Sequence, residues 1–422
     1  MIHLVRTYRE LFAVREFRAI FGTQCLAVAS ASVGSLALGT ITYSATKNPI
    51  LSGLAMFGGP LIRLVASWFL LSASDLLRPR QALAGVAAVS CLADLLQAVP
   101  GMPWGMRFVI LALPWVAMSA TGGATMALVA DILPADSFVF GRATVNIATG
   151  GMQIVGYALG GILLLRLSTT TLFLCAAGAS VLALLVVLRG VGDHAPRTVS
   201  GSLVRRTRTI NRTLLASPLL RPVYLACWVP NGLVVGCESL FVPFAGRSAG
   251  YLFAATAVGM LVGDVLVGRF IPARIRGGLV EPLRFLLAAP YVVFLLHPPL
   301  IAAVALAVVA SAGYAASLPL QERLVDRTEP QIRGQVLGLN ATGMMAMQDI
   351  GALLAGSVAQ ELGGGEAAAA TAIGVMGCTS LAITTLLIPG LHRTRTPSNK
   401  TSGPRGLEPS PSAISLPAPR TH

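Results

Sequence analysis

This sequence has few charged residues, few histidines and almost no lysine, and each shortage excludes a class of protein. Only 11% of its 422 residues are charged, against roughly 25% in soluble globular domains. A water-soluble fold of this size is therefore not expected. The basic residues are nearly all arginine, with lysine only at positions 47 and 400, and alanine and glycine are abundant. This composition is typical of a GC-rich bacterial genome.

The patterns that would indicate an enzyme or a metal site are also missing. No Gly-x-x-x-x-Gly-Lys-Ser/Thr segment is present to hold a nucleotide phosphate. Apart from His3, the histidines fall in predicted loops or in the tail, so an intramembrane hydrolase site cannot be assembled from them. The six cysteines lie singly in apolar blocks, without the close pairing of zinc sites or disulfide frameworks: Cys25, Cys91, Cys175, Cys227, Cys237 and Cys378. We therefore expect that the protein is not an enzyme and that it binds no metal and no cofactor.

Long apolar blocks are what the sequence does contain, and its mean hydropathy is +0.74. Blocks of about 20 residues cross ~30 Å of hydrocarbon as a helix, at about 1.5 Å per residue. Division at charged or Pro/Gly-rich breaks predicts twelve spans, at 19–43, 50–74, 81–99, 104–131, 143–165, 168–188, 222–244, 249–268, 284–297, 299–319, 335–360 and 367–390. The fold class is therefore predicted to be all-α and transmembrane.

The distribution of basic residues predicts the orientation of these spans. With the N-terminus inside, 26 of the 31 lysines and arginines fall on inner segments, Arg284 among them. Short cytoplasmic loops carry such an excess of positive charge. The net charge of +14 is explained by this topology, because the basic patches are short and lack the aromatic interleaving of a nucleic-acid surface. We expect a multi-pass protein of the bacterial inner membrane with both termini cytoplasmic.

The predicted spans fall into two groups of six. The Arg-rich segment 190–217 shows no apolar periodicity and reads as a cytoplasmic linker between a bundle at 1–189 and a bundle at 218–391. The segment 392–422 is rich in Pro, Ser and Thr and is predicted to be a disordered tail. An internal repeat supports the division: Asp131, Gln153 and Gly156 match Asp326, Gln348 and Gly351 at one offset, and Asp75 and Arg80 match Asp264 and Arg269 at another.

Several short motifs now suggest a family. They are Glu16-Phe17-Arg18 before the first span, Thr46-Lys47-Asn48-Pro49 before the second, and Gly59-Pro60 within it. With them the sequence resembles the major facilitator superfamily over residues 17–390, and most closely its bacterial branch of macrolide and siderophore exporters. The resemblance implies two pseudo-symmetric six-helix bundles that alternate between inward-open and outward-open states.

The resemblance also implies a conformational latch between spans two and three. The family motif has a Gly, an Asp four residues later, and then a basic cluster. Here Asp75, Arg78 and Arg80 are kept, while Leu71 replaces the Gly, and Asp264 with Arg269 stands at the equivalent place in the second half. An Asp at an inner helix end can accept bonds from a neighbouring helix N-terminus and from Arg. The alternative is an ordinary positive-inside loop with one acidic residue.

Span five carries a second family motif. Gly156, Gly160 and Gly161 resemble an exporter signature in which Tyr157 replaces a Pro. Glycines at this spacing let helices approach closely, although generic glycine packing explains the pattern almost as well. The Arg that the family often has in span four before a Gly pair is absent from 114–123, which weakens the case for proton coupling through that element.

Ionisable residues inside spans are costly and are functional candidates by default. They are Arg63, Asp94, Glu238 and Asp349. Arg63 and Asp349 lie at comparable depth and are predicted to line a central cavity, either as a pair or facing a substrate or proton. The alternatives are that Arg63 pairs with Asp94, that Asp349 caps a polar helix contact, and that Asp94 and Glu238 snorkel to the outer surface. Uncharged candidates for the cavity wall are Asn146, Gln153 and Gln348.

Together these features predict a monomeric secondary transporter that exports a small, amphiphilic molecule by alternating access, driven by the proton gradient. Its partners would be that molecule, protons and the lipid bilayer, with no nucleic acid. Uptake of a solute by the same fold and a non-transporting role in membrane assembly are the alternatives.

Overall fold

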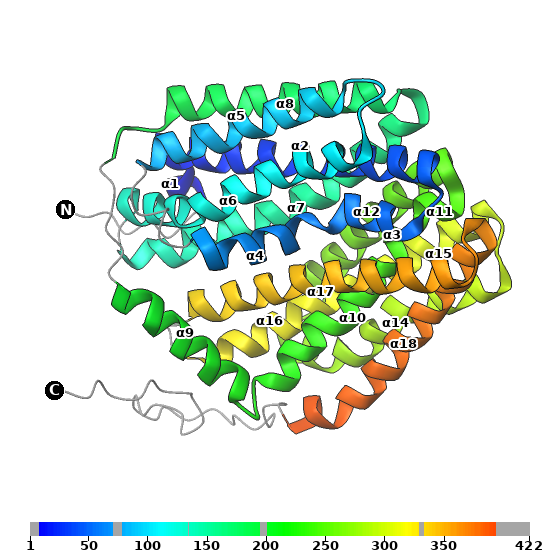
Figure 1. Cartoon of the computed structure of the whole chain (residues 1–422). Coiled ribbons are helices and arrows are strands. Elements are labelled where there is room, and N and C mark those ends of the chain that lie inside the picture. The colour runs from blue at the N-terminus through cyan, green and yellow to red at the C-terminus, as the bar shows by residue number, and fades with distance from the viewer. Residues whose placement is uncertain (1–7, 71–77, 134, 195–200, 329–332, 394–422) are drawn as a thin grey trace.

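The computed structural model of the chain describes residues 8–70, 78–133, 135–194, 201–328 and 333–393, and its regular structure is helical (Figure 1). The first half contains α1 (Tyr8–Ala13), α2 (Arg15–Thr46), α3 (Pro49–Phe57), α4 (Gly59–Leu70), α5 (Pro79–Gln97), α6 (Trp104–Ile132), α7 (Ala135–Arg166) and α8 (Thr169–Gly190). Asn48 caps α3 by accepting the Leu51 N–H, and Ser168 caps α8 by accepting the Thr171 N–H. These caps satisfy N–H groups that have no partner inside the helix.

The linker α9 (Gly201–Ala216) leads to the second half. This half contains α10 (Arg221–Ser239), α11 (Phe241–Ala245), α12 (Ala249–Val265), α13 (Ala273–Arg276), α14 (Val280–Val292), α15 (Leu300–Ala312), α16 (Ser317–Asp326), α17 (Arg333–Glu361) and α18 (Gly365–Arg393). Short 3-10 segments lie at Gly246–Ser248, Gly277–Leu279, Val293–Leu296 and Gly313–Ala316, and a π-helical turn at Leu266–Phe270 extends α12.

Two predicted segments flank the second half: the linker at 190–217 and the tail at 392–422. The segment 190–217 shows no apolar periodicity in the sequence, yet α9 within it buries Ile210 and Leu214 in the core of the second half. Two apolar residues four apart lie on one face of a helix and are enough to dock it there, and the assignment of the segment as a linker remains a prediction. The predicted tail, 392–422, lies outside the described residues from 394 onward, and so does Asp75.

Among the described residues, six helical runs are long and apolar enough to cross a membrane: Arg15–Thr46, Thr169–Gly190, Arg221–Phe270, Gly277–Leu296, Leu300–Asp326 and Gly365–Arg393. The chain is therefore a multi-pass membrane protein, as the hydropathy predicted. The count of twelve spans remains a prediction. Pro290 lies within α14 without ending it.

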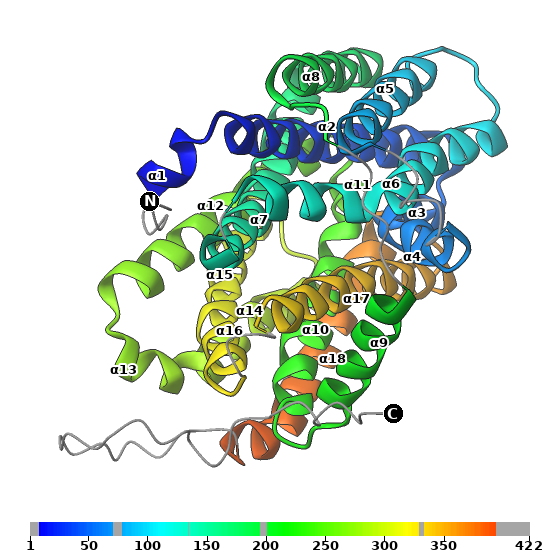
Figure 2. The ribbon, with the colours of Figure 1, turned by 90° about the vertical axis from the view of Figure 1, so that its left-hand side faces the viewer.

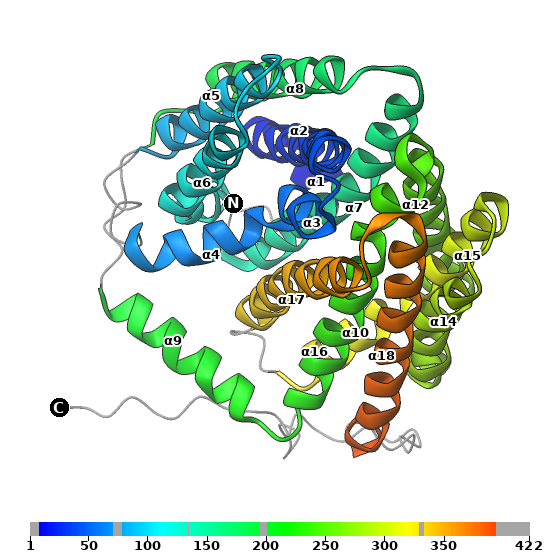
Figure 3. The same ribbon diagram turned by 45° about the vertical axis from the view of Figure 1, so that its right-hand side comes forward.

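The helices run between two ends that differ in charge. We call the end that holds α1, α9 and Arg15, Arg78 and Arg189 the arginine-rich end, and the end that holds the turns at 47–48, 167–168 and 246–248 the opposite end. In Figure 1, α1 and α9 lie on the left and α3 and α11 on the right. Figure 2 views the molecule from the side of α1, and Figure 3 shows α17 and α10 crossing below α3 and α4.

The halves share a hydrophobic core at the opposite end. One cluster of buried side chains contains Leu36, Tyr43 and Phe57 from the first half together with Phe253 and Ala352 from the second. Backbones also meet there, because a Cβ at Gly161 of α7 would lie 2.9 Å from the Gly250 carbonyl oxygen of α12. Only residues without a side chain permit such an approach.

At the arginine-rich end each half has a core of its own. One cluster there is drawn from residues 11–191, around Phe17 and Val187, and another from residues 210–391, around Tyr224 and Leu324. The buried clusters of the described residues therefore join the halves at one end and separate them at the other.

The glycines that the repeat relates occupy corresponding contacts. Gly156 of α7 faces Ser32 of α2, and Gly351 of α17 faces Gly232 of α10. Because α2 and α10 are the first long helices of their halves, the repeat is reproduced in helix packing as well as in sequence.

Candidate functional site

Asp349, near the middle of α17, is a buried acidic residue between the two halves. Its residue surface is 2% exposed. The first turn of α4 places the backbone of Leu61 beside its carboxyl group, while Oδ2 has no hydrogen-bond partner within the described residues. Asp349 therefore lies where the second half meets a backbone donor of the first, and one carboxyl oxygen has bonding capacity to spare.

The break between α3 and α4 supplies that donor. Gly58 ends α3 through its N–H bond to Leu54, and Pro60 has no N–H. A side chain at Gly59 would overlap the Trp115 ring, so the break also fits closely against α6. Leu61 is in the first turn of α4, where backbone N–H groups lack intrahelical acceptors and an anion is favoured. Transporters use such broken helices to bind charged groups inside the membrane.

Arg63 lies on α4 two residues beyond Leu61 and is partly buried. It thus lies near the depth of Asp349, and its role in lining a central cavity remains a prediction. Within the part of the chain that the structure describes, no salt bridge joins Arg63 to Asp349 or to Asp94. The Arg63 guanidinium and the Asp349 carboxyl group therefore lie near the same depth in the molecule without forming an ion pair.

Tyr157 forms an aromatic bridge between the halves. Its ring lies 5.8 Å from that of Phe57 in α3 and stacks on Phe253 of α12, with centroids 5.9 Å apart and 21° between the planes. The Ser35 hydroxyl of α2 donates to the Tyr157 hydroxyl at 3.3 Å. The residue that replaces the Pro of the exporter motif is therefore a contact between α2, α3, α7 and α12.

The three motif glycines around Tyr157 pack helices together. Gly156 and Gly160 face α2, where added Cβ atoms would meet Ser32 and Leu36, and Gly161 faces Gly250 across the two halves. Two of these contacts are inside the first half and one is between halves.

The uncharged candidates are distributed over α7 and α17. Gln348 of α17 donates from Nε2 to the Oδ1 atom of Asn231 in α10 at 3.1 Å. Gln153 of α7 is partly buried, and its side chain makes no hydrogen bond to another described residue. The side chain of Asn146 lies outside the described part of the structure.

Asp94 of α5 is held inside the first half. Its Oδ2 accepts hydrogen bonds from the hydroxyls of Ser30 in α2 at 3.1 Å and Ser180 in α8 at 3.3 Å. Ser30 also bonds to the Ala176 carbonyl oxygen at 2.8 Å. These contacts join three helices of one half, and they differ from the predicted alternatives of a pair with Arg63 or a surface-directed carboxylate.

Glu238 lies at the end of α10 and is only 7% exposed, so it does not snorkel to the surface. Its Oε1 accepts a hydrogen bond from the Tyr314 hydroxyl at 3.1 Å. Tyr291 of α14 and Ser311 of α15 are also buried, and their hydroxyls have no hydrogen-bond partner within the described residues. The second half therefore holds a cluster of buried polar side chains, some of which have no hydrogen-bond partner within the described residues.

Arg284 is a buried charge that the sequence analysis missed. We assigned it to an inner segment at the start of the ninth span, but it lies inside α14, is 3% exposed, and its Nε has no hydrogen-bond partner in the described part of the chain. The signal was helical spacing, because Arg284, Leu287 and Tyr291 recur at three and four residues on the buried face.

Two of the predicted latch residues, Arg78 and Arg80, bond inside the first half. Arg78 pairs with Asp193 at 2.6 Å, and Arg80 donates to the Leu188 carbonyl oxygen at 2.5 Å, so both hold the end of α8. Asp264 and Arg269 are exposed on α12 and its π-helical turn. They take part in no ion pair with another described residue.

The chemistry available at the centre is the binding and release of a proton or of a small polar group. Among the described residues, no group of three or more His, Cys, Asp or Glu side chains is placed to hold a metal ion. A surface groove lined by Leu318, Glu322 and Leu337 lies near α16, away from Asp349.

No protein-family model matches the sequence, and no curated protein matches it. Solved structures do match the fold. A POT family transporter in complex with a thioalcohol-conjugated peptide superposes with a TM-score of 0.68 at 13% identity, covering 90% of this chain and 97% of that chain. A bacterial homolog of the human lysosomal transporter Spinster, in an inward-facing and occupied conformation, gives 0.64 at 13%, covering 91% and 98%.

A D-xylose-proton symporter gives a TM-score of 0.59 at 13% identity, covering 90% of this chain and 97% of that chain. At these identities the likeness concerns the fold. In its described residues the chain has a helical fold like that of these transporters, and nothing in the matches singles out the exporter branch.

Proposed function

We propose that this protein is a secondary active transporter that moves a small molecule across the bacterial inner membrane by alternating access. The observation that carries the proposal is Asp349, a buried carboxyl group on α17 that lies beside the first turn of the broken helix α4 in the other half. A charge at this position costs free energy. Its place between the two halves gives the charge a use, because binding at it biases how the halves are arranged.

The distribution of the cores supports one state of this cycle. The halves share a core around Phe57 and Phe253 at the opposite end and keep separate cores at the arginine-rich end. A molecule joined in this way can open at the arginine-rich end without exposing the shared core. The excess of arginine at that end favours a cytoplasmic location, so this state would face inward, with twelve spans and both termini cytoplasmic.

The proposal assigns a role to each candidate residue. Asp349 would take up a proton or a cationic group, and Arg63 would hold an anionic group at the same level. Gln348, Gln153, Asn146 and Tyr157 would line the path, and Glu238 with Tyr314 would form a second proton-binding group. Asp94, bonded to two serines inside one half, would stabilise that half.

The direction of transport is proposed to be outward, with proton entry driving export of an amphiphilic molecule. The support is the glycine motif of span five, whose Gly161 forms the close contact with Gly250 between the halves. Proton-coupled uptake is the second candidate, because one similar structure is a D-xylose-proton symporter. In the latch, Arg78 and Arg80 would stabilise the end of α8, while Asp264 and Arg269 would form bonds in another state of the transport cycle.

The test compares cells that lack their own efflux pumps and produce the wild type, Asp349→Asn or Arg63→Ala. Growth is measured against a panel of cationic dyes and antibiotics, and dye accumulation is measured with and without a protonophore. Export predicts lower accumulation with the wild type, reversed by the protonophore and lost in Asp349→Asn. Uptake predicts higher accumulation with the wild type and the same loss in the variant.

Glu361→Gln is the matched control, because it makes the corresponding chemical change at an exposed carboxylate at the end of the same helix, α17. It should transport as the wild type does. If purified wild type in liposomes moves no compound of the panel under an imposed pH gradient, the non-transporting alternative replaces this proposal. If Asp349→Asn and Arg63→Ala are produced and transport normally, transport stands and the site assignment is wrong.

A further inference from the structure

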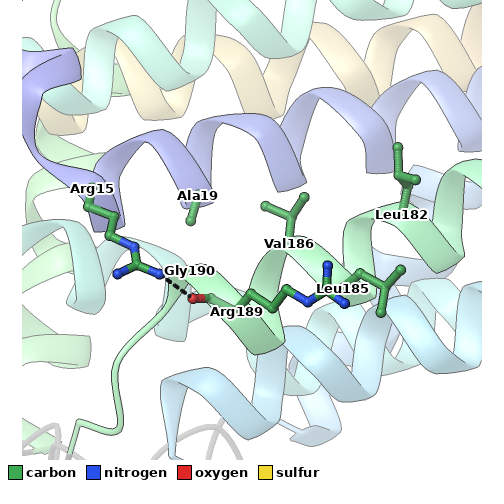
Figure 4. A pocket seen from close by; sticks show the side chains of 7 residues that line it. All are labelled: Arg15, Ala19, Leu182, Leu185, Val186, Arg189 and Gly190. Atoms are coloured by element: carbon green, nitrogen blue, oxygen red, sulfur yellow. Dashed lines mark hydrogen bonds between the residues drawn. The ribbon is translucent and has the colours of Figure 1, made fainter.

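A groove of about 360 Å³ lies on the outer surface of the first half, between the start of α2 and the end of α8 (Figure 4). It is at the arginine-rich end. Its lining combines two basic residues with apolar ones: Arg15, Ala19, Leu182, Leu185, Val186, Arg189 and Gly190. None of these residues takes part in the site around Asp349.

The two arginines carry charge that nearby groups leave uncompensated. Arg15 donates from Nη2 to the Arg189 carbonyl oxygen at 3.1 Å, which caps the end of α8 and leaves its other N–H groups available. The Arg189 side chain has no hydrogen bond to another described residue, and in Figure 4 it extends toward Leu185. The carboxylate of Glu16 is already engaged by the Gly192 N–H at 3.2 Å and by His194 at 2.9 Å.

The apolar wall of the groove lies on a helix that can cross the membrane. Leu182 and Leu185 are 54% and 39% exposed, and both belong to the candidate span Thr169–Gly190. Exposed leucines on a span face hydrocarbon, whereas arginines at its end lie at the level of the lipid headgroups. The groove therefore offers apolar surface at acyl-chain depth and guanidinium groups at phosphate depth.

We propose that this groove is a binding site for an anionic phospholipid of the inner leaflet. The Arg15 and Arg189 guanidinium groups bind the headgroup phosphate, and one acyl chain lies along Leu182, Leu185 and Val186. Arginine binds phosphate through paired N–H groups, and basic pockets between helices on the cytoplasmic side suit anionic headgroups. A soluble phosphate would have no use for the apolar wall, so the combination favours a lipid.

The test uses the full-length protein, purified and delipidated in detergent, with dioleoyl phosphatidylglycerol and dioleoyl phosphatidylcholine as probes in native mass spectrometry. We expect phosphatidylglycerol to bind at least about tenfold more tightly than phosphatidylcholine. The double variant Arg15→Ala/Arg189→Ala should lose this preference. Leu185→Trp, which keeps both charges and fills the groove, should weaken binding of phosphatidylglycerol as well.

The matched control is Arg166→Ala/Arg247→Ala, which removes two exposed arginines at the opposite end, where Arg247 likewise donates to a helix-end carbonyl, that of Leu167. It should bind phosphatidylglycerol as the wild type does. If the Arg15/Arg189 variant does not fold, Arg189→Gln with Leu185→Trp carries the test. Equal binding of the two lipids by the wild type, unchanged preference in the groove variants, or competition by inorganic phosphate alone would overturn the proposal.

Discussion

The two ends of this helix bundle are held together by different means. At the opposite end, glycine backbones of α7 and α12 meet, Tyr157 stacks on Phe253, and Arg247 reaches from one half to the Leu167 carbonyl oxygen of the other. At the arginine-rich end, the interactions of Arg15, Arg78 and Arg80 all stay within the first half.

This difference distinguishes contacts that resist opening from contacts that permit it. Apolar and glycine contacts between halves are lost when an end opens, and the exposed surface then costs free energy. Arginine contacts inside one half persist whatever the halves do. Because of this asymmetry, the arginine-rich end is the one that can open without disturbing either core. Variants of residues at the two ends test the difference between them.

The largest effect should come from Gly250→Val. Its side chain would overlap the Gly161 backbone and force the opposite end apart. We expect transport to fall about a hundredfold, and the free energy of unfolding to fall by about 1–3 kcal/mol, the usual cost of overpacking. Transport assays and thermal unfolding in detergent measure the two quantities.

Gly178→Val is the control for this variant, because a Cβ at Gly178 meets nothing within 4 Å. It should resemble the wild type in both assays. Full transport by Gly250→Val would mean that the close glycine contact is not needed to seal the opposite end.

A smaller effect is expected from Asp349→Asn. This change keeps the shape of the side chain, but the side chain can no longer be negatively charged at the boundary between the halves. Transport should fall at least about tenfold, equivalent to about 1.4 kcal/mol in the transport barrier. Asp94→Asn should leave transport within about threefold of the wild type and lower the melting temperature instead, because its serine bonds lie inside one half. The opposite ranking would exchange the roles of the two acids.

Tyr157→Phe should have a lesser effect still. It keeps the stack with Phe57 and Phe253 and removes only the hydrogen bond from Ser35, a loss of about 1 kcal/mol in the free energy of unfolding. Tyr157→Ala removes the ring as well and should cost about 3–5 kcal/mol. Thermal unfolding of both variants measures the difference, and equal losses would mean that the ring does not join the halves.

The smallest effect is expected from Arg78→Ala. Arg78 and Asp193 are 51% and 52% exposed, and exposed ion pairs contribute at most about 1 kcal/mol. A double-mutant cycle with Asp193→Asn, followed by thermal unfolding, should give a coupling energy below that value. Abolished transport in Arg78→Ala with unchanged stability would instead give Arg78 a role in switching between states.

Some particular residues show how far sequence reasoning reached. The depth of Arg63 and Asp349 followed from counting residues along spans, since each residue advances a helix by about 1.5 Å. The contact of Asp349 with the Leu61 backbone did not follow, because it depends on how α17 packs on α4 and on a helix break. Arg284 was misplaced for a related reason, since its burial depends on which face of α14 meets its neighbours.

The amino-acid sequence alone indicates a helical membrane protein, because its apolar segments of about 20 residues have the length that a helix needs to cross the hydrocarbon with its backbone groups bonded internally. The tertiary structure alone decided which charges meet, which glycines touch, and at which end the halves share a core. Those outcomes depend on contacts between residues far apart in the chain, and inside a membrane the apolar pattern does not specify them, since lipid and protein interior are equally apolar.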